Sequence, residues 1–482
     1  MVFDYSVENN NNMSNKKIAV IGGGISGLAA AYSLEEMAQR KGKSISITLF
    51  EKNNRIGGNI LTERVGDFLI EGGPDCFLSE KPWAIQLCEW LGMGESLLRT
   101  NDEYRRTYIY WKGRLRELPE GIMLMIPTRF FPLLKSDLFS LAGKLRMGME
   151  LFIPKRKSGG DESLSEFVRR RLGQEIVERV AEPLVAGVHA ENPDAMSIKS
   201  RFPRFVQMEE EYGSLIKGML AKRKIMLNSE SGKPKWTMFM TLKNGLDELP
   251  LTIVKALKMT TIITNKEVSE INKVSGYKIY LKNRDTIDAD VVIFATPSYE
   301  TGRLLRGLNS SISDQLDTIP YVSTATISLA YKKDSILHPM NGFGFLVPRV
   351  ENRRIMGASW VSRKFSYRTP DDSILIRCFI GGSRNEELVF LDDKDMLKMI
   401  REELRDVMGI SAEPILTRIY RWEKAMPQYI IGHDERVSRI EQSISKYPDM
   451  FVTGSAYRGG GISECIKNAQ LTAESVLKYL NL

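Results

Sequence analysis

The chain has 482 residues, of which 43% are hydrophobic and 27% charged, with a formal net charge of +8. This composition excludes a disordered, fibrous or collagen-like protein, and the length predicts two or three domains. The basic surplus favours acidic partners such as carboxylates, phosphates or anionic lipids. Because long Lys/Arg blocks and RNA-binding aromatic signatures are missing from the sequence, we expect no nucleic-acid partner.

The ends and the cysteines indicate a cytoplasmic protein. Residues 1–15 contain acids and a run of Asn but lack the apolar segment of a signal peptide, so we expect a disordered leader. The longest uncharged run, 318–331, is too short to span a bilayer. The four cysteines form no CxxC, which indicates a reducing compartment. The three histidines are dispersed, and no metal site is predicted.

The first elements predict a βαβ unit. A hydrophobic strand at 18–21 runs directly into glycines, and a helix is expected at 26–39. The alternating pattern of 44–50 predicts a second strand that ends at Glu51. Such a unit is the usual frame of a dinucleotide site.

The glycines between the first strand and the helix form a GxGxxG motif. Gly22 permits the tight turn, Gly24 lets the backbone approach a pyrophosphate, and Gly27 lets the helix pack on the strand. The helix N-terminus then faces the phosphates with free N–H groups. Glu51 lies 24 residues after Gly27, where an acid accepts hydrogen bonds from ribose hydroxyls and disfavours the 2′-phosphate of NADP.

Two further glycine clusters favour FAD over NAD. The first extends from EKNNRIGGN, with Arg55 and Gly57–Gly58, to Gly73 in IEGGPD. The second is GSAYRGGGI at 454–462, which precedes the last predicted helix. Glycines allow close backbone approach to a long cofactor, and a helix N-terminus near the flavin stabilises the negative charge of its reduced form.

The rest of the chain alternates apolar, helical and strand-like segments. Residues 120–153 are apolar but interrupted by prolines and basic residues, which suits either an interfacial patch or a buried helical core. A helix is expected at 162–182, with Ser163 and Glu166 as a capping pair. Strands are predicted at 278–282, 288–297, within 322–380 and at the start of 450–461, and helices at 395–408 and 463–480.

These stretches together resemble the oxygen-dependent, FAD-containing protoporphyrinogen and coproporphyrinogen oxidases of the amine-oxidase superfamily. The likeness runs from about residue 16 to 480. Its most specific segments are VAEPLVAGVHAENPDAMSIKSRFP from Val180, GFGFLVP at 342–348, MPQYIIGH at 426–433 and GSAYRGGGISECI at 454–466.

The resemblance implies an α/β fold: a Rossmann-type FAD-binding domain, a discontinuous mixed-sheet substrate domain and a helical, membrane-facing subdomain. The ranges expected for the FAD-binding domain are 16–80, 235–297 and 440–482. Those for the substrate-binding domain are 81–110, 200–234 and 298–439, and 111–199 is expected to form the helical, membrane-associating domain.

The activity implied is the oxidation of protoporphyrinogen IX to protoporphyrin IX in haem biosynthesis. Three two-electron hydride transfers to a non-covalently bound FAD are expected, with O2 as the acceptor and H2O2 as product. The same family supplies coproporphyrinogen III oxidation as an alternative. An amine oxidase, a carotenoid desaturase-like flavoenzyme or a flavin-bearing binder without turnover are further alternatives. Because the cofactor performs the chemistry, no catalytic side chain is predicted.

The resemblance also implies which residues bind FAD and substrate. The residues carried over for FAD are Gly22, Gly24, Gly27, Glu51, Arg55, Gly57, Gly58, Gly73, Val268, Trp422, Gly454, Gly461 and Ile462. The substrate propionates need cations, and the candidates are Lys81, Arg105 and Arg106. The plant members place an Arg where Thr107 falls here, so Arg106 is the candidate substitute. The apolar walls of the macrocycle site are expected from Phe77, Val188, Leu346 and Met356.

Other partners are open at this stage. Peripheral contact with a membrane fits the 120–153 segment. The sequence leaves open a homodimer and a complex with the next enzyme of the haem pathway.

Overall fold

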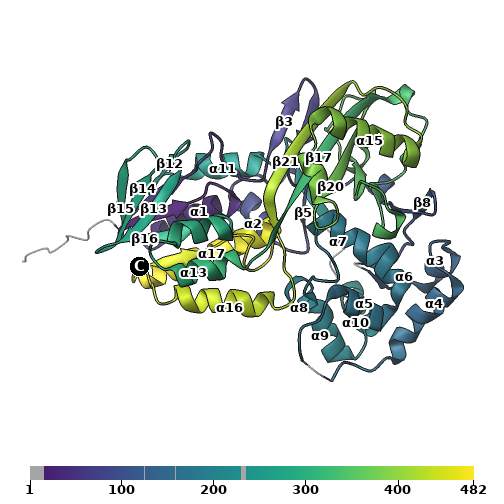
Figure 1. Ribbon diagram of the computed structural model, residues 1–482, viewed down its shortest axis with the longest axis horizontal. Helices are drawn as coiled ribbons and strands as arrows, with labels where there is room; N and C mark the ends of the chain where they lie inside the picture. Colours follow the sequence, from purple (N-terminus) through teal and green to yellow (C-terminus); the bar gives the residue numbers. More distant parts are fainter. Residues whose placement is uncertain (1–15, 124, 158, 229–234) are drawn as a thin grey trace, which may run out of the picture.

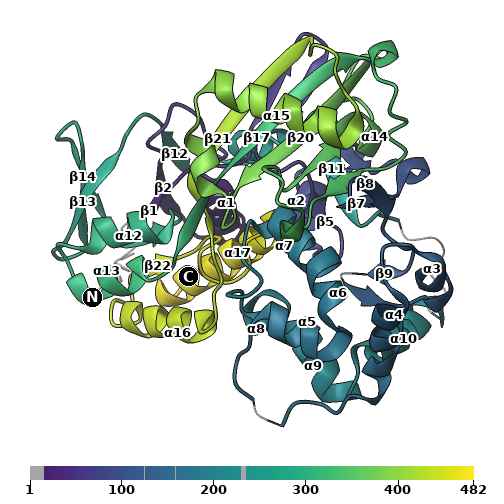
Figure 2. The same cartoon turned by 45° about the vertical axis from the view of Figure 1, so that its right-hand side comes forward.

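The computed structural model describes residues 16–123, 125–157, 159–228 and 235–482. The leader expected at 1–15 lies outside the described residues. Figures 1 and 2 show three bodies: a parallel sheet wrapped by helices, a larger twisted sheet above it, and a group of short helices to one side.

The first body is built on a five-stranded parallel sheet in the order β12-β2-β1-β16-β22. Residues 18–21 of β1 are buried, as expected for a strand covered on both faces. This sheet confirms the predicted Rossmann-type fold, with strands drawn from distant parts of the chain. Its strands are β1 (Lys16–Ile21), β2 (Ile45–Phe50), β12 (Thr260–Ile263), β16 (Val291–Phe294) and β22 (Met450–Val452).

Helices cover both faces of the parallel sheet. One core joins it to α1 (Ile25–Arg40), α2 (Trp83–Trp90), α11 (Glu248–Ala256) and α17 (Ile462–Tyr479). A second core lies on the opposite face and adds three helices and a small antiparallel sheet. These are α12 (Ser298–Leu305), α13 (Ser310–Asp317), α16 (His433–Ile444), β13 (Val268–Lys273), β14 (Tyr277–Leu281) and β15 (Thr286–Ala289).

The structure of this second layer differs from two expectations drawn from the sequence. The domain boundary expected between 297 and 298 falls inside it, because α12 and α13 pack on the parallel sheet. The strand predicted at 288–297 is divided at Asp290: β15 belongs to the antiparallel sheet and β16 to the parallel one. The chain turns there because the Asp290 N–H is bonded to the carbonyl of Lys17.

The second body is a seven-stranded mixed sheet in the order β21-β17-β20-β19-β18-β7-β8. α15 (Asp393–Met408) covers one face through a large apolar core. The other face is turned toward the first body (Figure 2). The strands are β7 (Thr107–Trp111), β8 (Arg114–Glu117), β17 (Tyr321–Lys332), β18 (Gly344–Leu346), β19 (Gly357–Trp360), β20 (Ser373–Gly381) and β21 (Leu416–Pro427).

Short elements join the two sheets. β5-β11-β6 form a three-stranded sheet and β3-β4 form a hairpin pair, whereas the pair β9-β10 packs in the core of the helices described below. Their bounds are β3 (Thr62–Val65), β4 (Phe68–Glu71), β5 (Phe77–Leu78), β6 (Leu97–Arg99), β9 (Ile122–Met123), β10 (Ile126–Pro127) and β11 (Phe239–Leu242), and the single-turn α14 is Val361–Lys364.

The third body contains α3 to α10 around a separate apolar core. Its helices are α3 (Phe130–Lys135), α4 (Leu141–Gly148), α5 (Leu164–Leu172), α6 (Gln174–Ile176), α7 (Glu182–His189), α8 (Ile198–Arg201), α9 (Pro203–Tyr212) and α10 (Leu215–Asn228). Residues of α8 and α9 share this core, so the helical body continues past the boundary expected at 199.

The helix expected at 162–182 is shorter than predicted. Ser163 and Glu166 form the expected capping box at the start of α5. Gly173 then ends the helix with φ +98, and a Cβ there would lie 2.6 Å from Cγ of Arg146. The chain continues as α6, a π-helical turn (Val177–Ala181) and α7. Among the described residues, no helix has both the length and the apolar character needed to cross a bilayer.

A buried ion pair ties the helical body together. Glu150 and Arg171 are both fully buried, and the Glu150 carboxylate accepts a hydrogen bond from Arg171 Nε at 2.9 Å. It also accepts hydrogen bonds from Ser214 Oγ at 2.5 Å and from the backbone N–H of Leu215 at 2.8 Å. The carboxylate therefore connects the segment after α4 to α5 and to the start of α10.

Glu150→Gln is expected to destabilise the protein by about 3–5 kcal/mol, because it removes the nearer counter-ion of the buried Arg171 and leaves only Glu209, at 3.4 Å and shared with Arg170. Urea unfolding followed by circular dichroism measures this loss. The matched control is Glu120→Gln, which breaks the exposed pair with Arg129 and is expected to cost less than about 1 kcal/mol. Equal effects of the two variants would contradict the prediction.

Candidate functional site

The turn between β1 and α1 excludes side chains. Gly22 has φ +111, and a Cβ there would lie 2.7 Å from the carbonyl oxygen of Ala295. A Cβ on Gly27 would lie only 1.9 Å from the carbonyl oxygen of Gly22. Gly24 forms an isolated bridge with Gly57, and a Cβ on Gly58 would lie 3.0 Å from Cα of Gly24. The bare backbone at the start of α1 is a cradle of the kind that binds a pyrophosphate.

Glu51 ends β2 next to this cradle. Its Oε2 accepts a hydrogen bond from the N–H of Gly23 at 2.9 Å, and its Oε1 accepts one from the N–H of Asn53 at 2.9 Å. Each carboxylate oxygen can accept more than one hydrogen bond, so the group can also receive ribose hydroxyls. The N–H of Lys266 donates to the carbonyl of Glu51 at 3.1 Å. This bond brings Val268, two residues further along the chain, close to Glu51.

Arg55 shapes the neighbouring glycine turn. Its guanidinium donates to the carbonyl oxygens of Gly58 at 2.6 Å and Ile60 at 3.1 Å. Burial lowers the pKa of Arg55 below its usual value. The side chain therefore holds Gly57 and Gly58 in place against Gly24.

The second glycine pair is held by the seven-stranded sheet. The carbonyl oxygen of Gly72 accepts hydrogen bonds from Trp422 Nε1 at 2.9 Å and from Thr326 Oγ1 at 2.8 Å. Arg377 Nη2 donates to the carbonyl of Gly73. A Cβ on Gly73 would lie 1.7 Å from the carbonyl oxygen of Asn59. Side chains from β21, β17 and β20 of the seven-stranded sheet therefore hold Gly72 and Gly73 in place.

Sequence reasoning identified Gly73 and Trp422 but missed Thr326 and Arg377. The available signal was a charged residue inside SILIRCFIG, an otherwise apolar and buried strand. A buried Arg in such a strand needs acceptors, and the structure supplies them from Gly72 and Gly73.

A buried charge cluster lies beside these glycines. Lys364 Nζ is 2.8 Å from Asp75 Oδ2 and 3.4 Å from Cys76 Sγ. Burial alone would raise the pKa of Asp75, but Lys364 and Arg377 outweigh it and hold the pKa well below its usual range. Arg368 and Glu71 also act on this cluster, so three cations face two carboxylates. The excess positive charge favours negative charge on a cofactor nearby.

The last glycine cluster leads into α17. Gly454 has φ +130 with open space where a Cβ would be, and Gly461 is the N-cap of the helix. The first turns of α1 and α17 are in contact, because Cys465 interacts with Ser26. Ser463 Oγ is buried in this region without a hydrogen-bond partner.

These residues fit FAD. Two helix N-termini converge, a carboxylate stands at the end of β2, and glycines leave space along the path between them. The orphaned Ser463 hydroxyl is a further polar group for the cofactor. When bound, the flavin supplies the two-electron acceptor, and the chain's own groups hold and orient it.

Two stacked side chains hold the loop at 454–461. Tyr429 OH donates to the carbonyl of Ser455 at 2.7 Å, and His433 Nε2 lies 2.9 Å from the carbonyl of Tyr457. The two rings stack at 3.8 Å, and Arg201 covers Tyr429 at 3.5 Å. Burial lowers the pKa of His433 to about 4, so the ring is neutral at pH 7 and Nε2–H donates.

Lys81, predicted for carboxylate binding, follows β5 and packs beside the first turn of α17. It forms an ion pair with Glu464, and its side chain is 40% exposed. Burial, followed by the charge of Arg204, lowers the pKa of Lys81 to about 8. Arg201 is also close, because its Nη1 lies 3.0 Å from the Cβ position of Gly460. Several cations therefore surround the loop that leads into α17.

The other predicted substrate residues are dispersed. Arg105 and Arg106 are exposed before β7, and Arg106 Nε lies 3.6 Å from Glu117. Phe77 is buried in the core of the first body. Val188 is 57% exposed on α7. Leu346 contacts the same helix at Gly187, and Met356 is buried nearby. The roles assigned to these side chains stay predictions.

Comparison with known proteins gives a consistent result. The model of the family "Flavin containing amine oxidoreductase" matches residues 25–477. A coproporphyrinogen III oxidase of Bacillus subtilis (strain 168) is 35% identical, covering 96% of this chain and 98% of the relative. Protoporphyrinogen oxidase 2 of Arabidopsis thaliana is 27% identical, covering 99% and 96%.

A solved structure supports the same grouping. A protein of Exiguobacterium sp. 255-15, assigned as a protoporphyrinogen oxidase, superimposes with a TM-score of 0.85 at 30% identity, covering 98% of this chain and 100% of that chain. The predictions of an oxidoreductase and of an FAD cofactor are confirmed. The chain belongs to the flavin-containing amine oxidoreductases, within the branch of the porphyrinogen oxidases.

Proposed function

We propose that the chain oxidises a porphyrinogen to the corresponding porphyrin, with FAD as cofactor and O2 as the electron acceptor, which is released as H2O2. The observation that supports this most directly is the group of cations where the FAD-binding loop enters α17. Lys81, Arg201 and Arg204 lie there together, paired with Glu464, Glu191 and Glu80 respectively. A peripheral carboxylate of the substrate can take the place of one of these glutamates. The relatives' names supply the substrate class.

Coproporphyrinogen III is the substrate we favour, ahead of protoporphyrinogen IX, which the sequence resemblance placed first. The relative at 35% identity is a coproporphyrinogen III oxidase, whereas the protoporphyrinogen oxidase is 27% identical. The substrate with four propionates also has more carboxylates to pair with the cations.

The purified, FAD-loaded protein is expected to oxidise both porphyrinogens, with at least about tenfold higher kcat/KM for coproporphyrinogen III, which corresponds to about 1.4 kcal/mol. Porphyrin fluorescence and oxygen consumption follow the reaction. A preference for protoporphyrinogen IX would reverse the substrate assignment. Absence of porphyrin from both substrates would refute the proposed function and favour an amine oxidase or a desaturase-like enzyme.

Lys81 gives the reaction a pH dependence. With a pKa of about 8, its ammonium is mostly charged at pH 7 and mostly neutral at pH 9, so KM should rise over this interval. Lys81→Gln is expected to raise KM about fivefold at pH 7, equivalent to about 1 kcal/mol, and to flatten the profile. Lys235→Gln, at an exposed Lys paired with Glu89, is the control and should leave the profile unchanged. A Lys81→Gln profile as steep as the unmodified one would assign the titration to another group.

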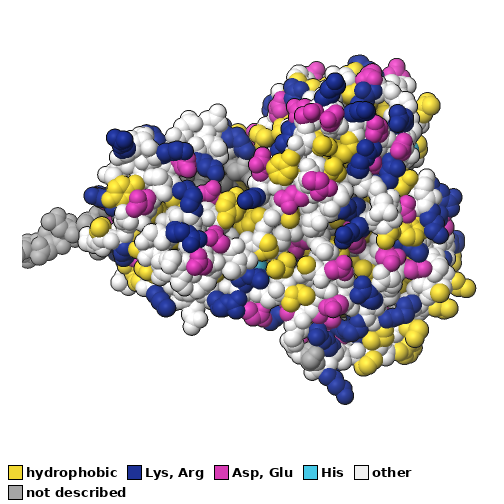
Figure 3. All heavy atoms as spheres, in the orientation of Figure 1, with side chains coloured by type: hydrophobic (Ala, Val, Ile, Leu, Met, Phe, Trp, Pro, Cys, Tyr) yellow, Lys and Arg dark blue, Asp and Glu magenta, His cyan; other side chains and the backbone are white. Residues whose placement is uncertain are grey.

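The helical body carries an exposed apolar face, which we propose as a membrane contact. Figure 3 shows hydrophobic side chains gathered where α3 and α4 lie in Figure 1. Basic residues of the same segment, Lys135 and Lys144, flank them. An apolar face with basic neighbours suits the surface of an anionic bilayer. This α3–α4 face consists of Phe130, Phe131, Leu134, Leu141, Leu145, Met149 and Phe152.

Vesicles rich in anionic phosphatidylglycerol are expected to sediment the protein more strongly than phosphatidylcholine vesicles. Replacing Phe131 and Phe152, which are 68% and 85% exposed, by Ser should weaken the partitioning by about tenfold or more, because each removes a buried aromatic contact with lipid. Leu337→Ser, at a 99% exposed position outside this face, is the control. Unchanged sedimentation of the double variant would show that the face does not contact the bilayer.

A further inference from the structure

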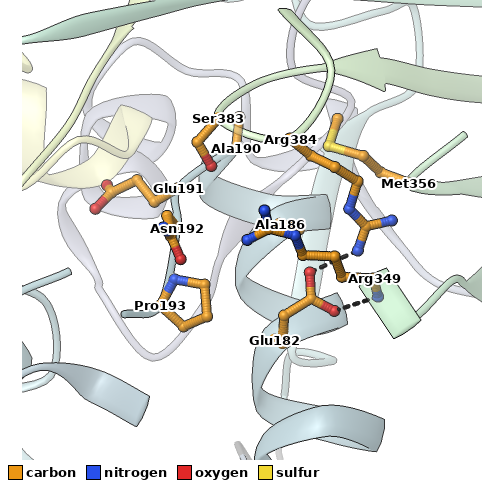
Figure 4. A pocket seen from close by; sticks show the side chains of 10 residues that line it. All are labelled: Glu182, Ala186, Ala190, Glu191, Asn192, Pro193, Arg349, Met356, Ser383 and Arg384. Carbon is orange, nitrogen blue, oxygen red and sulfur yellow. Dashed lines mark hydrogen bonds and ion pairs between the residues drawn. The ribbon is translucent and has the colours of Figure 1, made fainter. Parts of the chain in front are cut away.

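A small polar pocket lies between the helical body and the seven-stranded sheet. Its enclosed space is about 10 Å³, and the open mouth and adjoining solvent bring the total to about 250 Å³. Its wall includes Glu182 and Ala186 of α7, Arg349 from the connection after β18, and Ser383 and Arg384 after β20. Figure 4 shows these side chains converging from three separate segments. The enclosed space holds about one water molecule, so a larger group can lie only at the open mouth of the pocket.

One arginine of the pocket is buried and incompletely bonded. Arg384 is 7% exposed, and its Nη2 donates to Glu182 Oε1 at 2.5 Å. Both terminal nitrogens also donate to the carbonyl of Val347 at 3.1 Å. Its Nε is buried without a partner. A buried donor left unpaired costs about 1–3 kcal/mol, so this N–H indicates an acceptor, and the enclosed space holds one the size of a water molecule.

The second arginine has no counter-ion. Glu182 is engaged twice, by Arg384 and by the backbone N–H of Arg349 at 2.8 Å. Glu191, the other acid of the wall, is paired with Arg201. No ion pair or hydrogen bond joins the Arg349 guanidinium to any residue that the structure describes. In Figure 4 its side chain extends across Ala186 toward Asn192 and Glu191. The pocket therefore has an excess positive charge on an accessible guanidinium.

The pocket adjoins the candidate site. Glu191 Oε1 accepts a hydrogen bond from Arg201 Nε at 2.7 Å, and Arg201 reaches the loop at Gly460. Met356, predicted as a wall of the macrocycle site, lines the pocket as well. A ligand held beside α7 can thus extend a charged arm into it.

We infer that this Arg349–Arg384 pocket is a carboxylate subsite for the substrate, an inference that rests on the proposed porphyrinogen activity. The Arg349 guanidinium receives one peripheral carboxylate as a two-pronged ion pair at the mouth of the pocket, and a water in the enclosed space accepts a hydrogen bond from Arg384 Nε–H and donates one to the carboxylate. The planar guanidinium fork matches the two oxygens of a carboxylate, which a Lys ammonium does not. The carboxylate also balances the excess charge of the pocket.

Arg349→Gln and Arg349→Lys test this inference. Arg349 is exposed, so both variants should fold like the unmodified protein, which thermal unfolding verifies. The matched control is Arg354→Gln on the same connection, where the guanidinium is paired with Glu402 and Glu403 instead of facing the pocket. KM and kcat are measured with coproporphyrinogen III, and the Kd of its product, coproporphyrin III, by quenching of protein fluorescence.

Arg349→Gln is expected to raise KM and the product Kd about tenfold, with kcat changed less than about twofold. The KM and product Kd of Arg349→Lys should lie between those of Arg349→Gln and of the unmodified protein. Those of Arg354→Gln should match the unmodified protein. If the unmodified protein turns over and binds porphyrin while Arg349→Gln does so equally well, the subsite is refuted and the proposed function stands. If the unmodified protein neither binds nor oxidises the porphyrinogen, both are refuted.

Discussion

The hydrogen bonds to the carbonyl groups of Gly72 and Gly73 determine how the two sheets meet. Trp422, Thr326 and Arg377 come from three neighbouring strands of the seven-stranded sheet, and all bond to this one turn in the segment that joins the two sheets. Because glycine has no side chain, the turn can approach the backbone at Asn59, where a Cβ would lie 1.7 Å from a carbonyl oxygen. A larger residue at Gly73 would separate the strands that the FAD site needs close together.

Buried charge is the second organising feature. Lys364, Arg368 and Arg377, set against Asp75 and Glu71, place a net positive charge beside the glycine turn. Lys81, Arg201 and Arg204 form ion pairs with three glutamates at the start of α17, and Arg349 adds a positive charge beside α7 that is unpaired within the described part of the chain. A charge with low solvent exposure interacts strongly with an opposite charge. The distribution suits an electron-rich cofactor on one side and a substrate with several carboxylates on the other.

Each of the three bodies contributes a different part of the candidate site. The parallel sheet and its helices form the cofactor cradle, and the seven-stranded sheet covers it. The helical body contributes α7, the Arg201–Tyr429 contact and the exposed α3–α4 face. Tyr429 and His433 connect all of these to the loop at 454–461 through two carbonyl hydrogen bonds. Apolar cores and cations lie together where the three bodies join. Such a site suits a substrate that is apolar at its centre and has carboxylates at its edge.

Elements with a local physical cause can be predicted from residue type and spacing alone. The GxGxxG turn, Glu51 at the end of β2, the Ser163–Glu166 capping box and α17 after Gly461 all follow from spacing and residue type, and the structure has each of them. Only the tertiary structure decided which distant side chains meet. Arg377 and Thr326 bear no motif, and Phe77, expected at the substrate, is in a core. Arg349 and Arg384 line the same pocket only because three separate segments pack together there. Contacts between distant residues are set by packing and leave no regular spacing in the chain.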